Sequence, residues 1–307
     1  MISPGKARCI GAAHPGAETF ARLVDERYSL ATMRGMAPAD FLKAVAPWAS
    51  LDAYNAWLAA YMANDGSFLD HIAWGADRDL GGTYLYGAMD DRFASNASRL
   101  GLTETMVKGK RCCVVGAWDG TECLLLHALG AASVDAIEEV DAFRRMTELQ
   151  LSAWEVPHEP MRLMEVFAPS LYQANVHALW QRYDFLYVPG VLYHLTDLPT
   201  ALLILWALLK PGGVLAFESI AYPHMGAPTA RYLGASIPGW NWWGPTPDCY
   251  EALLRDCGFP DGRTVELSGG RGWWIGTRSD KAPPAIKCGA AGFSRPELLA
   301  ELRGLLR

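Results

Sequence analysis

Hydrophobic positions in the first third of the chain recur three or four residues apart, which is the spacing of one helical face. In residues 50–62, Ser50 is a favoured N-cap residue. The large apolar side chains that follow it would form one stripe: Tyr54, Trp57, Leu58, Tyr61 and Met62. We therefore predict that residues 1–105 form a helical N-terminal cap, which would act as a lid over a substrate site.

From about residue 106, short apolar runs alternate with helical patterns. The expected strands are residues 110–118, 133–140, 161–167, a run within 183–195, residues 212–220, and a final two-stranded hairpin over 263–279. Helices are expected at residues 120–130, 198–210 and 246–259. This alternation predicts an α/β fold with a doubly wound, mostly parallel seven-stranded sheet over residues 106–280.

The end of the chain, residues 281–307, is expected to be a linker followed by a C-terminal helix. Ser294 and Glu297 fit a capping box, and Pro296 suits a first helical turn. A stripe of leucines would then cover one side of the helix, at Leu298, Leu302 and Leu305. We expect this stripe to pack on the body of the protein or on a second subunit in a homodimer.

Composition narrows the class of protein. The 307 residues are 51% hydrophobic and 20% charged, which is typical of a globular chain. A formal charge of −6 argues against nucleic acid as a partner, because binding to a phosphate backbone draws its affinity from a basic face. The most apolar run, residues 201–209, is too short to span a membrane. Seven cysteines without a C-x-x-C pair predict reduced thiols in a cytoplasmic protein.

A glycine turn is the strongest candidate binding element. In "VVGAWDG", residues 114–120, Gly116 and Gly120 allow a tight turn after the first strand, where open α/β sheets bind ligands. Trp118 replaces the second glycine of the dinucleotide fingerprint, so a ligand without phosphates fits better than a pyrophosphate. Glu138, 22 residues after Gly116, would accept hydrogen bonds from ribose hydroxyls. The alternative for Glu138 is a solvated acid at a strand end.

Four segments in order, "VVGAWDGTE", "AIEE", "PGVLYHLTD" and "LLKPGGVLAFES", resemble the class I S-adenosylmethionine-dependent methyltransferases, which have a Rossmann-like fold. The resemblance implies that S-adenosylmethionine is the cofactor. It also implies a set of cofactor-binding residues: Gly116, Ala117, Trp118, Asp119, Gly120, Glu138, Pro189, Gly190 and Val191. One position departs from the family, because Val114 stands where an acid is usual. The cofactor's amino group would then need backbone carbonyls or Asp119 as its partner.

Within this family, "GVLYHL", "PGWNWWGPTPDCYEALLRDCGF" and the "GAWDG" turn are similar to the branch that contains the tRNA wobble-uridine carboxymethyltransferase. That branch carries basic residues after "VLYH", where this chain has "LTD". A carboxylated cofactor would need a basic partner, for which Arg271 is the candidate; the alternative for Arg271 is a surface arginine in the hairpin. Carboxymethyl or methyl transfer to tRNA is therefore kept as the alternative function.

The leading interpretation is ordinary methyl transfer to a small molecule. The chain resembles small bacterial methionine S-methyltransferases in size and in its helical N-terminal part, so methionine is the expected acceptor. Aromatic faces suit a sulfonium and arginines suit a carboxylate. Substrate-binding candidates are therefore Tyr84, Tyr86, Trp240, Trp242, Trp243, Arg231 and Arg271. Each tryptophan could instead be a packed core or lid residue.

His194 and Tyr193 are the catalytic candidates. His194 could serve as a general base for a hydroxyl, amine or thiol acceptor, or only as a structural hydrogen-bonding group, whereas a thioether acceptor would need no base. No metal site is predicted. A non-catalytic cofactor-binding module remains a second alternative, supported by Val114. A nicotinamide oxidoreductase is disfavoured because the second glycine is missing.

Overall fold

The computed structural model describes residues 96–118, 120–139, 147, 171–234, 241–287, 293 and 295–307, together with the backbone of β1 (Arg78–Asp79) and β2 (Tyr84–Leu85). Its centre is a six-stranded sheet with strands in the order β4-β3-β5-β6-β10-β9. The first four are parallel, and β10 runs antiparallel to both β6 and β9. The strands are β3 (Arg111–Val115), β4 (Ser133–Ile137), β5 (Tyr183–Pro189), β6 (Leu209–Ile220), β9 (Arg263–Ser268) and β10 (Arg271–Thr277).

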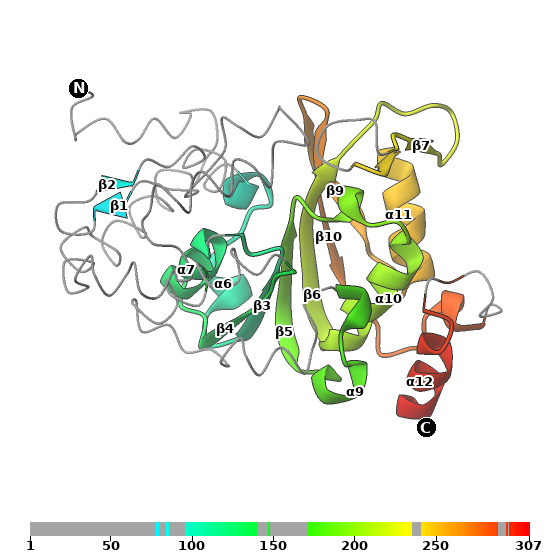
Figure 1. Cartoon of the computed structure of the whole chain (residues 1–307), viewed down its shortest axis with the longest axis horizontal. Coiled ribbons are helices and arrows are strands. Elements are labelled where there is room, and N and C mark those ends of the chain that lie inside the picture. Colours follow the sequence, from blue (N-terminus) through cyan, green and yellow to red (C-terminus); the bar gives the residue numbers. More distant parts are fainter. Residues whose placement is uncertain are drawn as a thin grey trace, which may run out of the picture.

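Helices cover the sheet. Those with two or more turns are α7 (Thr121–Ala128), α10 (Leu198–Leu208), α11 (Pro247–Asp256) and α12 (Leu298–Leu305). Single turns are α6 (Glu104–Val107), α9 (Val176–Leu179), η3 (Leu171–Gln173), η4 (Leu192–His194) and η5 (Pro284–Lys287). In Figure 1, α10 and α11 lie to the right of strands β5 and β6, whereas α6 and α7 lie to the left, toward β3 and β4. A short antiparallel pair, β7 (Ala230–Tyr232) and β8 (Trp243–Pro245), precedes α11.

The helix α10 is buried on all sides, which explains why its sequence is a continuous apolar run. All but one of its eleven residues are buried, so the helix has no polar face. The side chain of Asp197 caps its first turn by accepting a hydrogen bond from the backbone N–H of Thr200, at 3.0 Å. The strands beside it are also buried along most of their length, as expected for a parallel sheet covered on both faces.

The α/β alternation and the final hairpin are confirmed by this topology. The central sheet has six strands among the residues that the structure describes, and the strand expected at residues 161–167 lies outside them. Most of the expected N-terminal helical cap also lies outside them; residues 96–99 are helical, and β1 and β2 are short strands within that segment. Among the residues described, no helix is both long and apolar enough to cross a bilayer.

The expected capping box at the C-terminal helix is wrong. α12 begins at Leu298, and Glu297 is its N-cap residue without a side-chain capping hydrogen bond. The carboxylate of Glu297 instead accepts a hydrogen bond from Arg295 Nε at 3.1 Å. The leucine stripe packs on the body of the same chain, because Leu298 and Leu302 are fully buried within it. A homodimer stays a prediction.

Five cysteines are described and all are free thiols, as expected: Cys112, Cys113, Cys123, Cys249 and Cys257. Cys112 and Cys113 are completely buried in β3. Burial, together with the nearby carboxylate of Asp184, raises the pKa of the Cys112 thiol to about 12. These thiols therefore pack as small hydrophobic groups.

Candidate functional site

The glycine turn connects β3 to α7 at the carboxyl edge of the sheet. Gly116 and Gly120 have φ angles of 74° and 87°, which a residue with a Cβ adopts only under strain. Trp118 also lies in this region, with φ of 49°. A Cβ at Gly116 would overlap Cγ2 of Val191, so the turn after β3 directly meets the turn after β5. Only glycine fits that contact.

Glu138 lies beside the same turn. It follows β4, is 8% exposed, and its Oε2 accepts a hydrogen bond of 2.9 Å from the backbone N–H of Trp118. The backbone N–H of Gly116 donates to the carbonyl of Ile137 at 2.8 Å, which fixes the end of β4 against the turn. The expected proximity of Glu138 to the glycine turn is therefore confirmed, and its solvated alternative is not. Its binding to a ribose stays a prediction.

The turn after β5 carries the catalytic candidates. β5 ends at Pro189, Gly190 has φ of 69°, and its N–H donates to the carbonyl of Glu218 at 3.0 Å. The next residues form η4, which places Tyr193 and His194 side by side with ring centroids 4.1 Å apart. His194 is half-buried and Tyr193 is buried. Both side chains thus belong to the same loop as the expected cofactor-binding residues.

A buried ion pair lies next to Tyr193 and was missed by the sequence reasoning. Glu218, near the end of β6, is 3% exposed and pairs with Arg271 at the start of β10. Arg271 donates from Nε to Oε1 of Glu218, and from Nη2 to Oε2 at 2.7 Å. The same Nη2 donates to the hydroxyl of Tyr193 at 3.2 Å. The signal that could have found Glu218 is an acid inside the apolar run "VLAFESI".

The ion pair with Glu218 keeps the guanidinium of Arg271 charged. Burial alone would lower the pKa of the Arg271 guanidinium, but its hydrogen bonds to Glu218 and Tyr193 outweigh burial and hold that pKa above its ordinary value. Arg271 therefore stays cationic, and Glu218 has the partner that a buried carboxylate requires. Two N–H donors on Nη1 of Arg271 make no hydrogen bond within the part of the chain that the structure describes.

The segment around β7 and β8 brings two of the expected tryptophans to the Tyr193 loop. The backbone N–H of Trp242 donates to the carbonyl of Tyr193 at 2.8 Å. Nε1 of Trp243 donates to the carbonyl of Thr196 at 3.0 Å. Arg231 is exposed, and its guanidinium lies 5.3 Å from the ring centroid of Tyr222. Both tryptophans therefore contact the Tyr193 loop, whereas the side chain of Arg231 contacts Tyr222.

Three expected site residues lie outside the described residues, namely Asp119, Tyr86 and Trp240, and Tyr84 is described only as backbone in β2. Among the residues described, no group of three or more His, Cys, Asp or Glu side chains gathers as metal ligands do. The described residues that meet at the carboxyl edge of the sheet are thus the glycine turn, Glu138, and the Tyr193 loop with Glu218 and Arg271.

No protein-family model matches the sequence, and no curated protein matches it significantly. Solved structures do resemble it. The N-terminal domain of EvdMO1, crystallised with S-adenosylhomocysteine and D-fucose, is 13% identical, with a TM-score of 0.50 over 67% of this chain and 91% of that domain. These values show a shared fold. The protein has the Rossmann-like α/β fold of that domain.

Two further structures have TM-scores too low to add to this argument. A SAM-dependent methyltransferase from Aquifex aeolicus is 15% identical, covers 56% of this chain and 84% of its own, and has a TM-score of 0.44. The 1,6-didemethyltoxoflavin-N1-methyltransferase of Burkholderia thailandensis is 18% identical over 61% of this chain and 76% of its own, with a TM-score of 0.43.

Proposed function

We propose that the protein is an S-adenosylmethionine-dependent methyltransferase that acts on a small molecule. The observation that carries the proposal is the contact between Trp118 and Glu138. It holds the buried carboxylate that follows β4 against the glycine turn that follows β3, where the hydroxyls of a nucleoside ribose would donate hydrogen bonds to it. Trp118 in place of glycine leaves a phosphate-free nucleoside as the better fit to this turn.

The residues fit this cofactor in two respects and depart from the usual pattern in one. Gly116 lacks the Cβ that would fill the space beside Val191. Glu138 can accept both ribose hydroxyls with its carboxylate. Val114 is fully buried in β3, so the amino group of the cofactor must bind elsewhere on the turn, to backbone carbonyls or Asp119. When bound, S-adenosylmethionine supplies an electrophilic methyl group on a positively charged sulfur.

Three side chains would bind or deprotonate the methyl acceptor: Tyr193, His194 and Arg271. The hydroxyl of Tyr193 accepts a hydrogen bond from the Arg271 cation, which makes its own O–H a stronger donor toward an acceptor. His194, half-buried beside it, would take a proton from an acceptor that has one to lose. Orientation is the loop's main contribution, because in-line transfer depends on alignment of the attacking atom.

Methionine is the acceptor that we propose to test first. Its thioether sulfur carries a lone pair and no proton, so it needs no base. Its carboxylate would be met by the two Nη1 donors of Arg271, since the remaining donors are committed to Glu218 and Tyr193. tRNA modification remains the alternative, although the net charge of −6 gives it little electrostatic support.

Cofactor binding is tested by calorimetric titration with S-adenosylhomocysteine. Glu138→Ala should weaken binding about tenfold or more, because hydrogen bonds to a charged group contribute about 1.5–3 kcal/mol. The matched control is Glu139→Ala, which removes the adjacent but exposed acid and should leave affinity unchanged. Equal affinities for the wild type and Glu138→Ala would remove Glu138 from the site.

Methyl transfer is tested by incubation with methyl-labelled cofactor and separate pools of methionine, other small metabolites and tRNA. Label in the small-molecule pool supports the proposal, and label in tRNA supports the alternative. Cofactor binding with no label in any pool would identify a non-catalytic module. His194→Ala should abolish transfer to a hydroxyl, amine or thiol but leave transfer to a thioether largely intact.

A further inference from the structure

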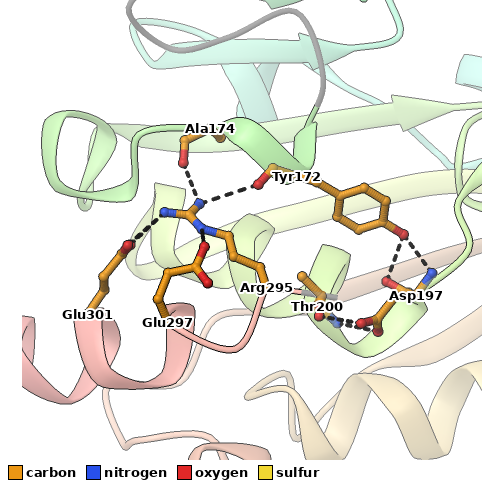
Figure 2. A network of polar contacts seen from close by, with 7 residues as sticks. All are labelled: Tyr172, Ala174, Asp197, Thr200, Arg295, Glu297 and Glu301. Carbon is orange, nitrogen blue, oxygen red and sulfur yellow. Dashed lines mark hydrogen bonds and ion pairs between the residues drawn. The ribbon is translucent and has the colours of Figure 1, made fainter. Parts of the chain in front are cut away.

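The loop that carries Tyr193 and His194 ends at Asp197, and a tyrosine from a distant segment holds that end. Figure 2 shows the hydroxyl of Tyr172, in η3, against the backbone of Asp197. The N–H of Asp197 donates to this hydroxyl at 2.6 Å, and the hydroxyl donates to the carbonyl of Asp197 at 3.0 Å. One side chain thus binds both polar groups of a single peptide residue.

Asp197 is also where α10 begins. Its Oδ1 accepts from the N–H of Thr200 at 3.0 Å and its Oδ2 accepts from the hydroxyl of Thr200 at 2.6 Å. Because α10 is almost wholly buried, its first turn is a rigid anchor. Tyr172 therefore fixes the loop at the point where it joins that anchor.

The position of Tyr172 depends in turn on the C-terminal segment. Nη1 of Arg295 donates to the carbonyl of Ala174 at 2.7 Å and to the carbonyl of Tyr172 at 3.5 Å. Nη2 of Arg295 pairs with both carboxylate oxygens of Glu301, at 2.9 and 2.7 Å, and Nε pairs with Glu297. The Arg295 side chain is only 15% exposed, so its contacts are only weakly screened by solvent.

We propose that Arg295 and Tyr172 are positioning residues, which together hold the Tyr193–His194 loop through the end of the chain. The connection runs from Arg295, in the segment that precedes α12, to the backbone of η3, and from Tyr172 to Asp197. The catalytic part of this inference rests on the proposed function, whereas the mechanical connection does not. The opposite end of the loop is held separately, by Arg271 at the hydroxyl of Tyr193 and by Trp242 at its carbonyl.

The chain offers a matched control for the role of α12. Arg303 also attaches this helix to the body, because its Nε and Nη2 both donate to the carbonyl of Ile286, at 3.1 and 2.5 Å. That contact leads to η5 and not to η3. Arg303→Gln should therefore loosen α12 without loosening the loop, whereas Arg295→Gln should loosen both.

The test is hydrogen–deuterium exchange of the full-length chain, followed by mass spectrometry of peptides that cover residues 190–200 and 298–305. In Arg295→Gln and in Tyr172→Phe, amides at Thr196 and Asp197 should exchange at least tenfold faster than in the wild type. In Arg303→Gln they should exchange at the wild-type rate, while the amides of α12 exchange faster. The double variant of Tyr172→Phe and Arg295→Gln should match Tyr172→Phe alone at the loop.

Equal acceleration at the loop in Arg303→Gln and Arg295→Gln would overturn the proposal, as would wild-type exchange at the loop in Tyr172→Phe. Tyr172→Phe keeps the aromatic ring in place, so it decides the question even where Arg295→Gln fails to fold. Once the methyl acceptor has been identified, Tyr172→Phe and Arg295→Gln should each lower kcat several-fold and leave the affinity for S-adenosylhomocysteine unchanged. Absence of any transferase activity would refute the proposed function. The exchange experiment would still test whether Arg295 and Tyr172 hold the loop.

Discussion

Gly116→Ala tests whether the two turns at the carboxyl edge meet as the structure has them. The new Cβ would meet two obstacles. The φ angle of 74° is costly for any residue with a Cβ, and Cγ2 of Val191 occupies the space that the methyl group needs. Because the obstructing atom belongs to a side chain and not to the backbone, a second substitution can remove it.

The cost of the backbone conformation and the cost of the overlap with Val191 can be measured separately. A left-handed conformation costs about 1–2 kcal/mol for alanine, and overpacking costs about 1–3 kcal/mol. Alanine also restricts the unfolded chain more than glycine does, which offsets about 0.4–1 kcal/mol of this loss of stability. Gly116→Ala should therefore lower the free energy of unfolding by about 1–4 kcal/mol. Gly212, with φ of 75° and nothing within 4 Å of its would-be Cβ, provides the backbone term alone.

Urea unfolding of five proteins measures these terms: the wild type, Gly116→Ala, Gly212→Ala, Val191→Ala, and Gly116→Ala combined with Val191→Ala. We expect the double variant to lose less stability than the sum of its single changes, by about 1–3 kcal/mol, because Val191→Ala removes the overlap. A sixth protein, Gly212→Ala combined with Val191→Ala, is the control and should show no such rescue. Equal losses in the two glycine variants, with simple additivity at Gly116 and Val191, would show that the turns do not touch.

Three other predictions follow from the buried and charged groups. Glu218→Gln should destabilise the protein by about 3–5 kcal/mol in thermal or urea unfolding, because it leaves the Arg271 cation buried without its counter-ion. The Cys112 thiol, with its pKa of about 12, should not react with a thiol reagent at pH 8 until the protein is unfolded. Partial burial raises the pKa of Asp184, but the hydrogen bonds from Lys210 and from the backbone N–H of Arg111, together with the nearby lysine charges, outweigh burial, and the net shift is downward. These contacts therefore stabilise the fold above pH about 4, and this contribution disappears as pH falls further. Lys210→Met should therefore lower stability by about 0.2–1 kcal/mol at pH 7, and by less at pH 3, as followed by urea unfolding at both pH values.

Local patterns were enough to predict the parts of the site that a single segment determines. Gly116 and Gly120 signal a turn by themselves, and the regular spacing of strands and helices predicts that Glu138 follows the adjacent strand. The buried run of α10 and the hairpin between β9 and β10 were also predictable, because apolar length and paired glycines are local features. These predictions need no knowledge of which segments meet in space.

The contacts that could not be predicted join residues far apart in the sequence. Glu218 and Arg271 are 53 positions apart, and Arg295 and Ala174 are 121 positions apart. An acid inside an apolar strand is visible in the sequence, but its partner is decided by the antiparallel pairing of β10 with β6. Glu297 shows the opposite error, because a local capping pattern was present but its carboxylate pairs instead with Arg295, two residues before it, whose guanidinium is also bound to the distant carbonyl of Ala174.

The charges beside Tyr193 also limit which acceptors the proposed enzyme can accommodate. Glu218 and Arg271 cancel one another, so a bare carboxylate bound at Nη1 of Arg271 would leave one uncompensated negative charge in a largely buried place. A zwitterionic amino acid brings its own ammonium group and restores neutrality. Methionine should therefore be methylated faster than 3-(methylthio)propionate, which has the same thioether and a carboxylate but no amino group. Equal kcat/KM values for the two compounds in the labelled-methyl assay would show that the acceptor carboxylate is bound away from this ion pair.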